Sequence, residues 1–469
     1  MPDRPNILLI LTDQQRGDCL GIAGHPVLQT PNLDSIAGAG AQFTRAYSTC
    51  PSCIAARRNL LSGQFPSTHG MVGYQEGVAW EPEATLPGVL REAGYQTWFV
   101  GRDMHQHPKR KRFGYDHMVC GDYDGEPDYA RWLRAHGPAG QAGIFGAGLL
   151  NNDWTARPWY LPEYLHYTNW VTDRALEFLE QRDPTCSFFL TVSYLAPHPP
   201  LQPPAFYFER YLRTGVPDPA IGDWEELPAH DGAGDDVASP HVHLQGEALL
   251  CARAAYYGAI NHIDDQLRRL LDRNTAVGRL TSDNTVVIFT SDHGEMLGDH
   301  YRWRKTVPYE GSARIPLLVR APERFGVKPR TLLDQPVCLE DIMPTALDFT
   351  GLETPSSVEG RSLLPLLRGE SVPWREALHI EHAPLHHTLT DGKEKFIWWV
   401  ADGREQFFDL TTDPTECHDL IREAAAQARI AHWRQRLVKE LAPRPEGFSD
   451  GRRLIPGRPY APVLPTSGR

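Results

Sequence analysis

The stretch NILLILTD, residues 6–13, is a short continuous apolar run that ends at a carboxylate, Asp13. A run of this length and composition is typical of a β-strand that is buried on both faces of a sheet. NTVVIFTSDHGE, residues 284–295, has the same design, and Asp292 and His293 directly follow its apolar part. We therefore expect two buried strands whose carboxyl ends place these polar side chains at one rim of a sheet.

The segments between these strands predict the rest of a main domain. SFFLTVSYLAPHPPL, residues 187–201, is a third buried strand that runs into a Pro-rich turn, and residues 256–273 form an amphipathic helix. Its apolar side chains at helical spacing are Ile260, Ile263, Leu267, Leu270 and Leu271. Alternating buried strands and amphipathic helices predict a three-layer α/β domain around one large sheet, with ligands held beyond the carboxyl ends of the strands.

Two regions lack this regularity. Residues 125–165 and 203–245 are rich in Gly, Pro, Trp and charge without clean periodicity, so we expect long loops over the rim that determine substrate choice. After residue 372 the pattern changes, and turns at Asp391-Gly392 and Asp402-Gly403 predict a small antiparallel sheet.

The chain thus divides into three predicted parts. A catalytic domain spans residues 1–372, a small α+β subdomain with a helix at its end spans 373–442, and a Pro-, Gly- and Arg-rich tail spans 443–469. The tail could pack on a neighbouring chain, which favours a homo-oligomer.

Composition restricts the partners of the protein. The chain has 47 Lys and Arg against 59 Asp and Glu, a formal net charge of -12, which argues against a nucleic-acid surface. No apolar stretch is long enough to span a membrane, and the first apolar run stops at Asp13 without a secretory cleavage site. We expect a cytoplasmic protein with mostly reduced cysteines, which acts on a small anionic substrate.

The stretch STCPSCIAARRNLLSG, residues 48–63, allows two readings. Cys50 and Cys53 have the spacing of a redox pair, but Pro51 and the surrounding order of segments are unlike a thioredoxin. Alternatively, Cys53 begins a helix and Arg57, one turn later, lies on the same face, where the two together with the helix N-terminus would hold an oxyanion.

At this point the chain resembles the sulfatase family, whose signature is Cys-x-Pro-x-Arg followed by Leu and a Thr-Gly or Ser-Gly pair. Ala55 takes the place of the Pro, a known variation. The matching residues are Cys53, Arg57, Leu60, Ser62 and Gly63. The resemblance runs from Asn6 to about Leu420 and includes PNILLILTDQQRGDCLG, SDHGEMLGDH and KTVPYEGSARIPLLV. It implies an alkaline-phosphatase-like fold with a mixed sheet, and oxidation of Cys53 to formylglycine by a formylglycine-generating enzyme.

A divalent cation site is predicted at the rim, because carboxylate oxygens converge from two strand ends there. The resemblance implies one cation held by Asp13, Gln14, Asp292, His293 and the modified Cys53. The family usually holds Ca²⁺, and a Gln and a His among the ligands also suit Mn²⁺ or Mg²⁺.

The resemblance also implies the catalytic groups. Arg57 orients the formylglycine hydrate, Lys305 reaches the sulfate, and His198 in APHPP protonates the leaving group. The family's Gly-Lys-x-His segment is replaced here by VGRDMHQHPKRKRFGYD, residues 100–116, so Arg102 takes the Lys place. His105 takes the place of the His, with His107 as the alternative.

These assignments predict a metal-dependent hydrolase of sulfate esters, similar to an arylsulfatase. A phosphonate monoester or phosphodiester hydrolase is the alternative, since those relatives share the Asp-Gln and Asp-His pattern. A catalytically silent binding protein would follow if Cys53 stayed a thiol, and a redox protein if Cys50 paired with it. His379, Glu381 and His382 either edge the pocket or form a polar face of the subdomain.

Overall fold

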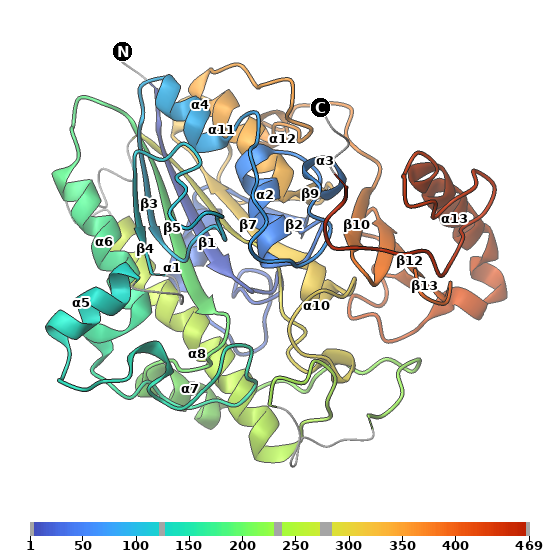
Figure 1. Cartoon of the computed structure of the whole chain (residues 1–469), viewed down its shortest axis with the longest axis horizontal. Helices are drawn as coiled ribbons and strands as arrows, with labels where there is room; N and C mark the ends of the chain where they lie inside the picture. Colours follow the sequence, from blue (N-terminus) through green and yellow to red (C-terminus); the bar gives the residue numbers. More distant parts are fainter. Residues whose placement is uncertain (1–3, 122–126, 229–236, 273–283, 466–469) are drawn as a thin grey trace.

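The computed structural model describes residues 4–121, 127–228, 237–272 and 284–465 (Figure 1). Its larger part is a nine-stranded sheet between helices, and its smaller part is a four-stranded sheet with helix α13 (Gln427–Leu441) packed against it. In Figure 1 the smaller part lies at the right-hand side of the molecule.

The large sheet is mixed, as predicted. Its strands are β1 (Asn6–Asp13), β2 (Ala41–Tyr47), β3 (Gln96–Gly101), β4 (His117–Cys120), β5 (Phe188–Pro197), β6 (Thr285–Ser291), β7 (Arg314–Arg320), β8 (Thr331–Leu333) and β9 (Val337–Cys338). The order is β4-β3-β5-β1-β6-β7-β2-β8, and β9 also pairs with β2. β7 is antiparallel to both of its neighbours, and the other pairs are parallel.

The three strands predicted from apolar runs, β1, β5 and β6, lie side by side in the middle of this sheet. β1 runs parallel to β6, and Thr12 pairs with Ser291 at the end of their ladder. Asp13 and Asp292 therefore follow neighbouring strand ends and share one rim, which confirms the expected arrangement.

Side-chain alternation along β1 shows why the sheet is covered on both faces. Ile7, Leu9 and Leu11 pack in one hydrophobic cluster, and Leu8 and Ile10 pack in another on the opposite face. The first face is covered by α2 (Cys53–Ser62), α4 (Leu86–Glu92), α11 (Ile342–Thr350) and α12 (Leu364–Leu367), and the second by α1 (Pro31–Gly38), α6 (Tyr167–Gln181) and α8 (Gly246–Leu271). The three-layer α/β prediction is confirmed, and the helix expected over 256–273 is the second half of α8.

The two regions predicted as loops contain helices. α5 (Asp128–His136) and α7 (Ala205–Thr214) lie in them, with 3-10 turns at Gly143–Phe145 and Glu163–Leu165. α7 forms because Tyr207, Phe208 and Tyr211 bury one helical face, so the prediction of continuous loops was wrong there. Parts of both regions, 122–126 and 229–236, lie outside the described residues.

The small sheet is antiparallel, as its two Asp-Gly turns predicted. It consists of β10 (Leu378–His382), β11 (His386–Thr390), β12 (Glu394–Trp399) and β13 (Glu405–Asp409), in that order. Two further helices are short. α3 (Pro66–His69) follows α2, and α10 (Glu310–Ala313) precedes β7.

The tail packs on the large part of its own chain. The Val72 N–H donates to the Pro462 carbonyl at 2.9 Å, and the Leu464 N–H donates to the Gly70 carbonyl at 2.8 Å. The tail thus contacts the segment that follows α3, and the homo-oligomer stays a prediction. The division of the chain at residues 372 and 442 stays a prediction.

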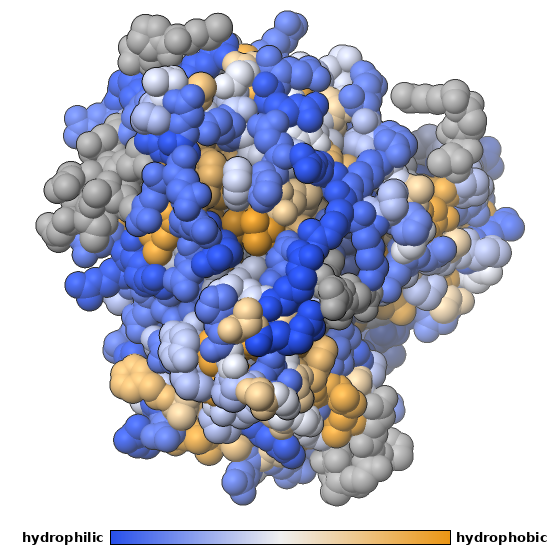
Figure 2. All heavy atoms as spheres, turned by 60° about the vertical axis from the view of Figure 1, so that its left-hand side comes forward, coloured by the Kyte–Doolittle hydropathy of each residue, from blue (hydrophilic) through white to orange (hydrophobic). Residues whose placement is uncertain are grey.

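The surface shows no sign of a large apolar face in the view of Figure 2, where most residues are hydrophilic and apolar ones form small separate groups. Across the described part of the chain, no helix combines the length and apolar character needed to span a bilayer.

Candidate active site

Cys53 is the first residue of helix α2. Ser52 before it is extended, and Gly63 ends the helix with a left-handed φ of 65°, a conformation that glycine adopts without strain. Leu60 and Leu61 point into the hydrophobic cluster on that face of the sheet, as predicted. The helix N-terminus therefore carries the thiol to the rim of the sheet and adds partial positive charge beside it.

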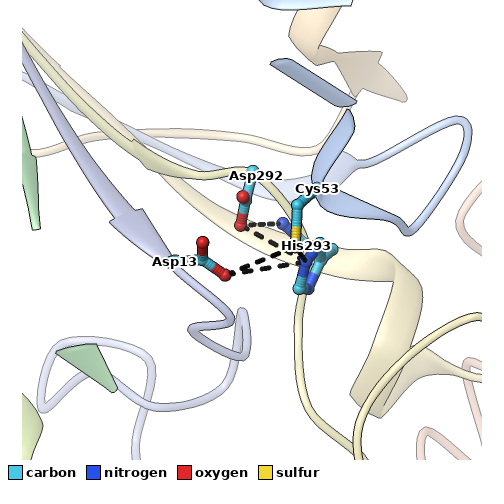
Figure 3. A group of neighbouring side chains, drawn as sticks. All are labelled: Asp13, Cys53, Asp292 and His293. Carbon is cyan, nitrogen blue, oxygen red and sulfur yellow. Dashed lines mark hydrogen bonds and ion pairs between the residues drawn. The ribbon is translucent and has the colours of Figure 1, made fainter. Parts of the chain in front are cut away.

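Four side chains converge at this rim (Figure 3). Asp13 from the end of β1, Cys53 from α2, and Asp292 and His293 after β6 offer ligand atoms that all lie within 4.8 Å of one another. The Cys53 Sγ is 3.1 Å from the His293 Nε2 and 3.8 Å from an Asp13 oxygen. The His293 Nε2 is also 3.7 Å from Asp13 and 3.7 Å from Asp292.

Arg57 connects the two carboxylates. Its Nη2 donates to Asp13 at 3.1 Å and its Nε to Asp292 at 3.0 Å, while its Nη1 donates to the Ser193 hydroxyl at 3.1 Å and the Asp103 carbonyl at 2.9 Å. The side chain is fully buried. The oxyanion contact expected from its spacing to Cys53 stays a prediction, and the structure adds that this guanidinium bonds both carboxylates.

The surroundings of Asp13 keep it ionised. Burial by itself would raise its pKa, but His198, Arg57 and Arg102 outweigh burial and hold the pKa well below its usual range. Because burial keeps His198 itself neutral, the two guanidinium groups carry this effect at neutral pH.

The donor set fits a divalent cation. The His293 Nδ1 lies 3.0 Å from the Gly294 carbonyl, so it carries the proton and leaves the Nε2 lone pair facing the carboxylates. Burial lowers the pKa of His293, which keeps the imidazole neutral as a ligand must be. Two carboxylates and one imidazole, all buried, form a set that hard and borderline cations accept.

Gln14 occupies a strained position next to Asp13. Its φ is 72°, a left-handed conformation that is uncommon outside glycine and that clusters at functional sites. The backbone is held there, since the N–H donates to Asp292 at 3.1 Å and the carbonyl accepts from the Tyr256 hydroxyl at 2.7 Å. Its amide oxygen accepts from the Lys305 Nζ at 2.6 Å, so Lys305 does reach the site.

Arg102 and His105 contact each other, and Arg102 also contacts Asp13. The Arg102 Nε is 3.3 Å from Asp13, and its Nη2 is 3.2 Å from the His105 Nε2. His107 is exposed to solvent, whereas His105 is half-buried. Of the two predicted alternatives, the geometry therefore brings His105 to the site.

His198 follows the Pro-rich end of β5. Its backbone N–H donates to the Asp13 carbonyl at 3.1 Å, and its Nδ1 lies 2.6 Å from the Pro199 carbonyl. The Nδ1 must carry the proton in that contact, which leaves the Nε2 for a substrate. Burial and the nearby Lys305 lower the pKa of His198 well below its usual range.

The second cysteine of the motif belongs to a different environment. Cys50 is buried in an apolar cluster with Ile54, Ala55 and Met71. Burial raises the pKa of its thiol well above the usual range, which is opposite to the activated thiolate that a redox pair requires. All eight cysteines are free.

Sequence reasoning missed two polar contacts of the site. Ser193 on β5 and Glu295 after His293 are both buried and hydrogen-bonded to Arg57 and Gln14 respectively. Glu295 stands inside SDHGEMLGDH and could have been singled out as a carboxylate two residues from a ligand. In the small sheet, Glu381 is paired with Arg444 at 2.9 Å and Tyr460 at 2.6 Å, both of which lie in the C-terminal tail.

Comparison with known proteins gives consistent matches. The family profile described as Sulfatase matches residues 5–352, and the profile described as N-sulphoglucosamine sulphohydrolase, C-terminal, matches residues 298–442. An arylsulfatase of Clostridium perfringens is 40% identical, with 98% of each chain covered. The multifunctional alkaline phosphatase superfamily protein PehA of Trinickia caryophylli is 30% identical, with 93% of this chain and 95% of the relative covered.

Comparison with solved structures shows a similar fold. The phosphonate monoester hydrolase of Agrobacterium radiobacter superimposes with a TM-score of 0.78 at 25% identity, covering 94% of this chain and 96% of that one. The alkaline-phosphatase-like architecture expected from the resemblance is therefore confirmed. The chain belongs to the sulfatase family and is a sulfuric ester hydrolase.

Proposed function

We propose that this sulfatase hydrolyses aryl sulfates, and that residue 53 is the nucleophile after oxidation of its thiol to formylglycine. The observation that carries the proposal is the position of Cys53 at a helix N-terminus, 3.1 Å from the His293 Nε2. Together with Asp13 and Asp292 these two residues form the buried group that we call the ligand cluster. The similarity to the arylsulfatase of Clostridium perfringens over 98% of both chains supports the aryl substrate class.

One divalent cation would be held by Asp13, Asp292, His293, the amide oxygen of Gln14 and the modified residue 53. Ca²⁺ is our first choice because oxygen donors predominate in this set, and Mn²⁺ or Mg²⁺ would also fit. When bound, the cation supplies positive charge that polarises the oxygens of the ester. Arg57 fixes both carboxylates by its hydrogen bonds at 3.1 and 3.0 Å, so their oxygens keep one orientation.

In the first proposed step, one hydroxyl of the formylglycine hydrate at position 53 gives its proton to the carboxylate of Asp13, which lies 3.8 Å from the Cys53 Sγ. Its oxygen forms a bond to sulfur while the bond from sulfur to the leaving alcohol breaks. Lys305 neutralises charge on the sulfuryl oxygens. His198 gives the leaving oxygen its proton through Nε2. An anionic ester beside His198 would raise the pKa of this imidazole, which provides the protonated form that the step requires.

In the second step, the remaining hydroxyl at position 53 loses its proton to His105. The bond from carbon to the sulfate oxygen then breaks, sulfate leaves, and the aldehyde is restored. Arg102 lies between His105 and Asp13 and would stabilise the negative charge that develops near the base. A serine at this position lacks the second hydroxyl and could not release sulfate by this route.

A phosphonate monoester is the second candidate substrate. The specific observation is the Asp13-Gln14 and Asp292-His293 pattern, which the resemblance to phosphonate monoester hydrolases includes. The structural similarity to the phosphonate monoester hydrolase of Agrobacterium radiobacter, with a TM-score of 0.78, points to the same substrate class.

Peptide mass spectrometry and a paired assay test the proposal. The chain is produced together with a formylglycine-generating enzyme, and the tryptic peptide that contains Cys53 is examined. We expect the mass change for replacement of CH₂–SH by an aldehyde, and faster turnover of an aryl sulfate than of the matching aryl phosphonate. A thiol that persists at full activity would contradict the nucleophile, and preference for the phosphonate would contradict the substrate class.

A further inference from the structure

Glu295 is a buried carboxylate that the proposed reaction does not use. It follows His293 by two residues, and only 3% of its surface is exposed. One of its oxygens accepts from the Gln14 Nε2. The other accepts from the backbone N–H groups of Leu297, at 2.9 Å, and Arg304. The carboxylate is thus held by backbone on one side and presents a single acceptor to the amide of Gln14 on the other.

This arrangement determines which way the amide of Gln14 points. A carboxylate such as Glu295 only accepts hydrogen bonds, and an ammonium such as Lys305 only donates them. The Gln14 Nε2 must therefore face Glu295, and the Oε1 must face the Lys305 Nζ, 2.6 Å away. The reversed amide would place two acceptors together at Glu295 and two donors together at Lys305.

Gln14, which carries this oxygen, adjoins the ligand cluster through its backbone. The Gln14 backbone N–H is 3.1 Å from an Asp292 oxygen, which ties this residue to the cluster. Lys305, the partner of the amide oxygen, is near enough to His293 and His198 to lower the pKa of both after the larger effect of burial. Both ends of the Gln14 side chain and its backbone are thereby positioned before any ligand arrives.

We propose that Glu295 is a positioning residue, which presents the amide oxygen of Gln14 to the cation of the metal site. This inference rests on the proposed function. It makes Gln14 and Glu295 a matched pair. The negative charge lies on Glu295, and the ligand atom lies on the Gln14 amide that is hydrogen-bonded to it. A carboxylate at position 14 would face the carboxylate of Glu295, at a cost typical of adjacent like charges in a buried site. The pair therefore requires an amide at one position and an acid at the other.

Exchanging the two groups tests the pair. We compare the wild-type chain with Gln14→Glu, Glu295→Gln and the double exchange, which have nearly the same shapes. In Gln14→Glu the two carboxylates repel each other. In Glu295→Gln the Gln14 amide must turn, or else two backbone N–H groups lose their acceptor. The double exchange restores every hydrogen bond, because the amide now at position 295 donates to the carboxylate now at position 14, and its oxygen accepts from Leu297 and Arg304.

The readout is the affinity for Ca²⁺ alone, measured by titration calorimetry on the full chain after chelation. We expect each single variant to bind Ca²⁺ about tenfold to a hundredfold more weakly, and the double exchange to return to within about threefold of wild type. Asp299→Asn, which removes a buried carboxylate of the same loop that pairs with Arg16, should change the affinity by less than about threefold.

Two failures would be distinguishable. If wild type binds Ca²⁺ but the single variants bind it equally well, or the double exchange binds it no better than they do, the positioning role of Glu295 is wrong. If wild type binds neither Ca²⁺ nor Mn²⁺, the proposed metal site is wrong. In that case melting temperatures of the same four chains in chelator report on the pair by itself: additive effects would refute the pairing, and recovery in the double exchange would support it.

Discussion

Two charge clusters in the described part of the chain share one composition, a fully buried basic side chain between two carboxylates. At the rim of the large sheet Arg57 binds Asp13 and Asp292 at 3.1 and 3.0 Å. Where the small sheet meets the large part, Lys395 of β12 lies 2.9 Å from Glu310 and 2.7 Å from Glu416. Both basic side chains are fully buried.

The difference lies in what else surrounds the carboxylates. Around Asp13 and Asp292 an imidazole, a thiol and an amide bring further ligand atoms, so the cluster has capacity for a cation and a substrate. The Lys395 ammonium is enclosed by the two carboxylates and the Pro308 carbonyl at 2.9 Å, and its cluster connects β12 to α10. A buried group of charges therefore indicates a catalytic or metal site where ligand atoms of several kinds converge. It indicates a structural contact between two parts of the protein where the charges only pair with one another.

The largest expected effect is at the first cluster. Cys53→Ala should lower kcat/KM for an aryl sulfate at least about a thousandfold, because it removes the nucleophile itself. Since alanine is tolerated inside a helix and the thiol only contacts the ligand cluster, the free energy of unfolding should stay within about 1 kcal/mol of wild type. Steady-state kinetics and urea unfolding measure the two quantities.

Lys305→Ala is the companion variant for this prediction. It should also lower turnover strongly with folding retained, since Lys305 reaches the site from a half-buried position through the Gln14 amide. Full activity in Cys53→Ala would rule out residue 53 as the nucleophile, whatever Lys305→Ala does.

For the second cluster we expect a loss of stability without a loss of activity. Lys395→Met removes the cation between two buried carboxylates, so Glu416 keeps the Glu310 N–H at 2.6 Å and Glu310 keeps Arg314 at 3.6 Å, but neither keeps the ammonium. This should lower the free energy of unfolding by about 3–5 kcal/mol. The kcat of the molecules that remain folded should be unchanged, because no group of the first cluster touches Lys395. Urea unfolding and kinetics at low temperature measure this.

Lys393→Met is the matched control for that variant. Lys393 is exposed just before β12, so its loss should change the free energy of unfolding by less than about 0.5 kcal/mol. Equal stability losses in the two variants would show that the buried cluster does not lock the small sheet to the large part.

The two clusters also differ in how far the sequence foretold them. Asp13 and Asp292 were predictable because each ends a continuous apolar run, and neighbouring parallel strands bring their ends together. Lys395 was not, since its partners Glu310 and Glu416 lie 85 and 21 residues away and no local pattern connects a lysine in EKFIWW with them. The same limit explains the orientation of the Gln14 amide, which depends on Glu295 and Lys305 far along the chain.

The helices missed in the two irregular regions have a different cause. α7 carried a readable signal, with Pro204 before it, Gly215 after it and aromatic residues at helical spacing. The surrounding Gly and Pro content hid that signal. Arg57 shows a different limit: helical spacing placed it correctly beside Cys53, but could not show that its guanidinium bonds two carboxylates from distant strands.

A smaller effect on activity is expected at His105, and almost none at His107, in the loop that follows β3. His105→Ala should lower kcat for aryl sulfate about a hundredfold, which is typical for loss of a general base, while His107→Ala should change it less than about twofold. The reason is position, because His105 contacts Arg102 at 3.2 Å and His107 is exposed. Pre-steady-state kinetics should show that His105→Ala still forms the sulfated intermediate but releases sulfate slowly. Equal kcat values for the two variants would contradict the assignment of the base.

The smallest expected effect concerns the pH dependence of the second cluster. Burial, with Glu310 adding to it, raises the pKa of Glu416 from 4.5 to about 7 despite Lys395. Between these two pH values the folded protein keeps a proton that the unfolded chain has released, so the stability that Glu416 contributes is complete below pH 4.5 and is lost as pH rises to about 7. The loss should amount to about 1–3 kcal/mol.

Glu416→Gln isolates this contribution from the other titrating groups, including Glu340, whose pKa burial also raises to about 7. The difference in free energy of unfolding between wild type and Glu416→Gln should therefore favour wild type more at pH 5 than at pH 8, by about 1–3 kcal/mol. Urea unfolding of both chains at the two pH values measures it. A difference that is the same at both values would mean that the proton is not held on Glu416, and that this carboxylate is charged throughout the range just as Asp13 of the first cluster is.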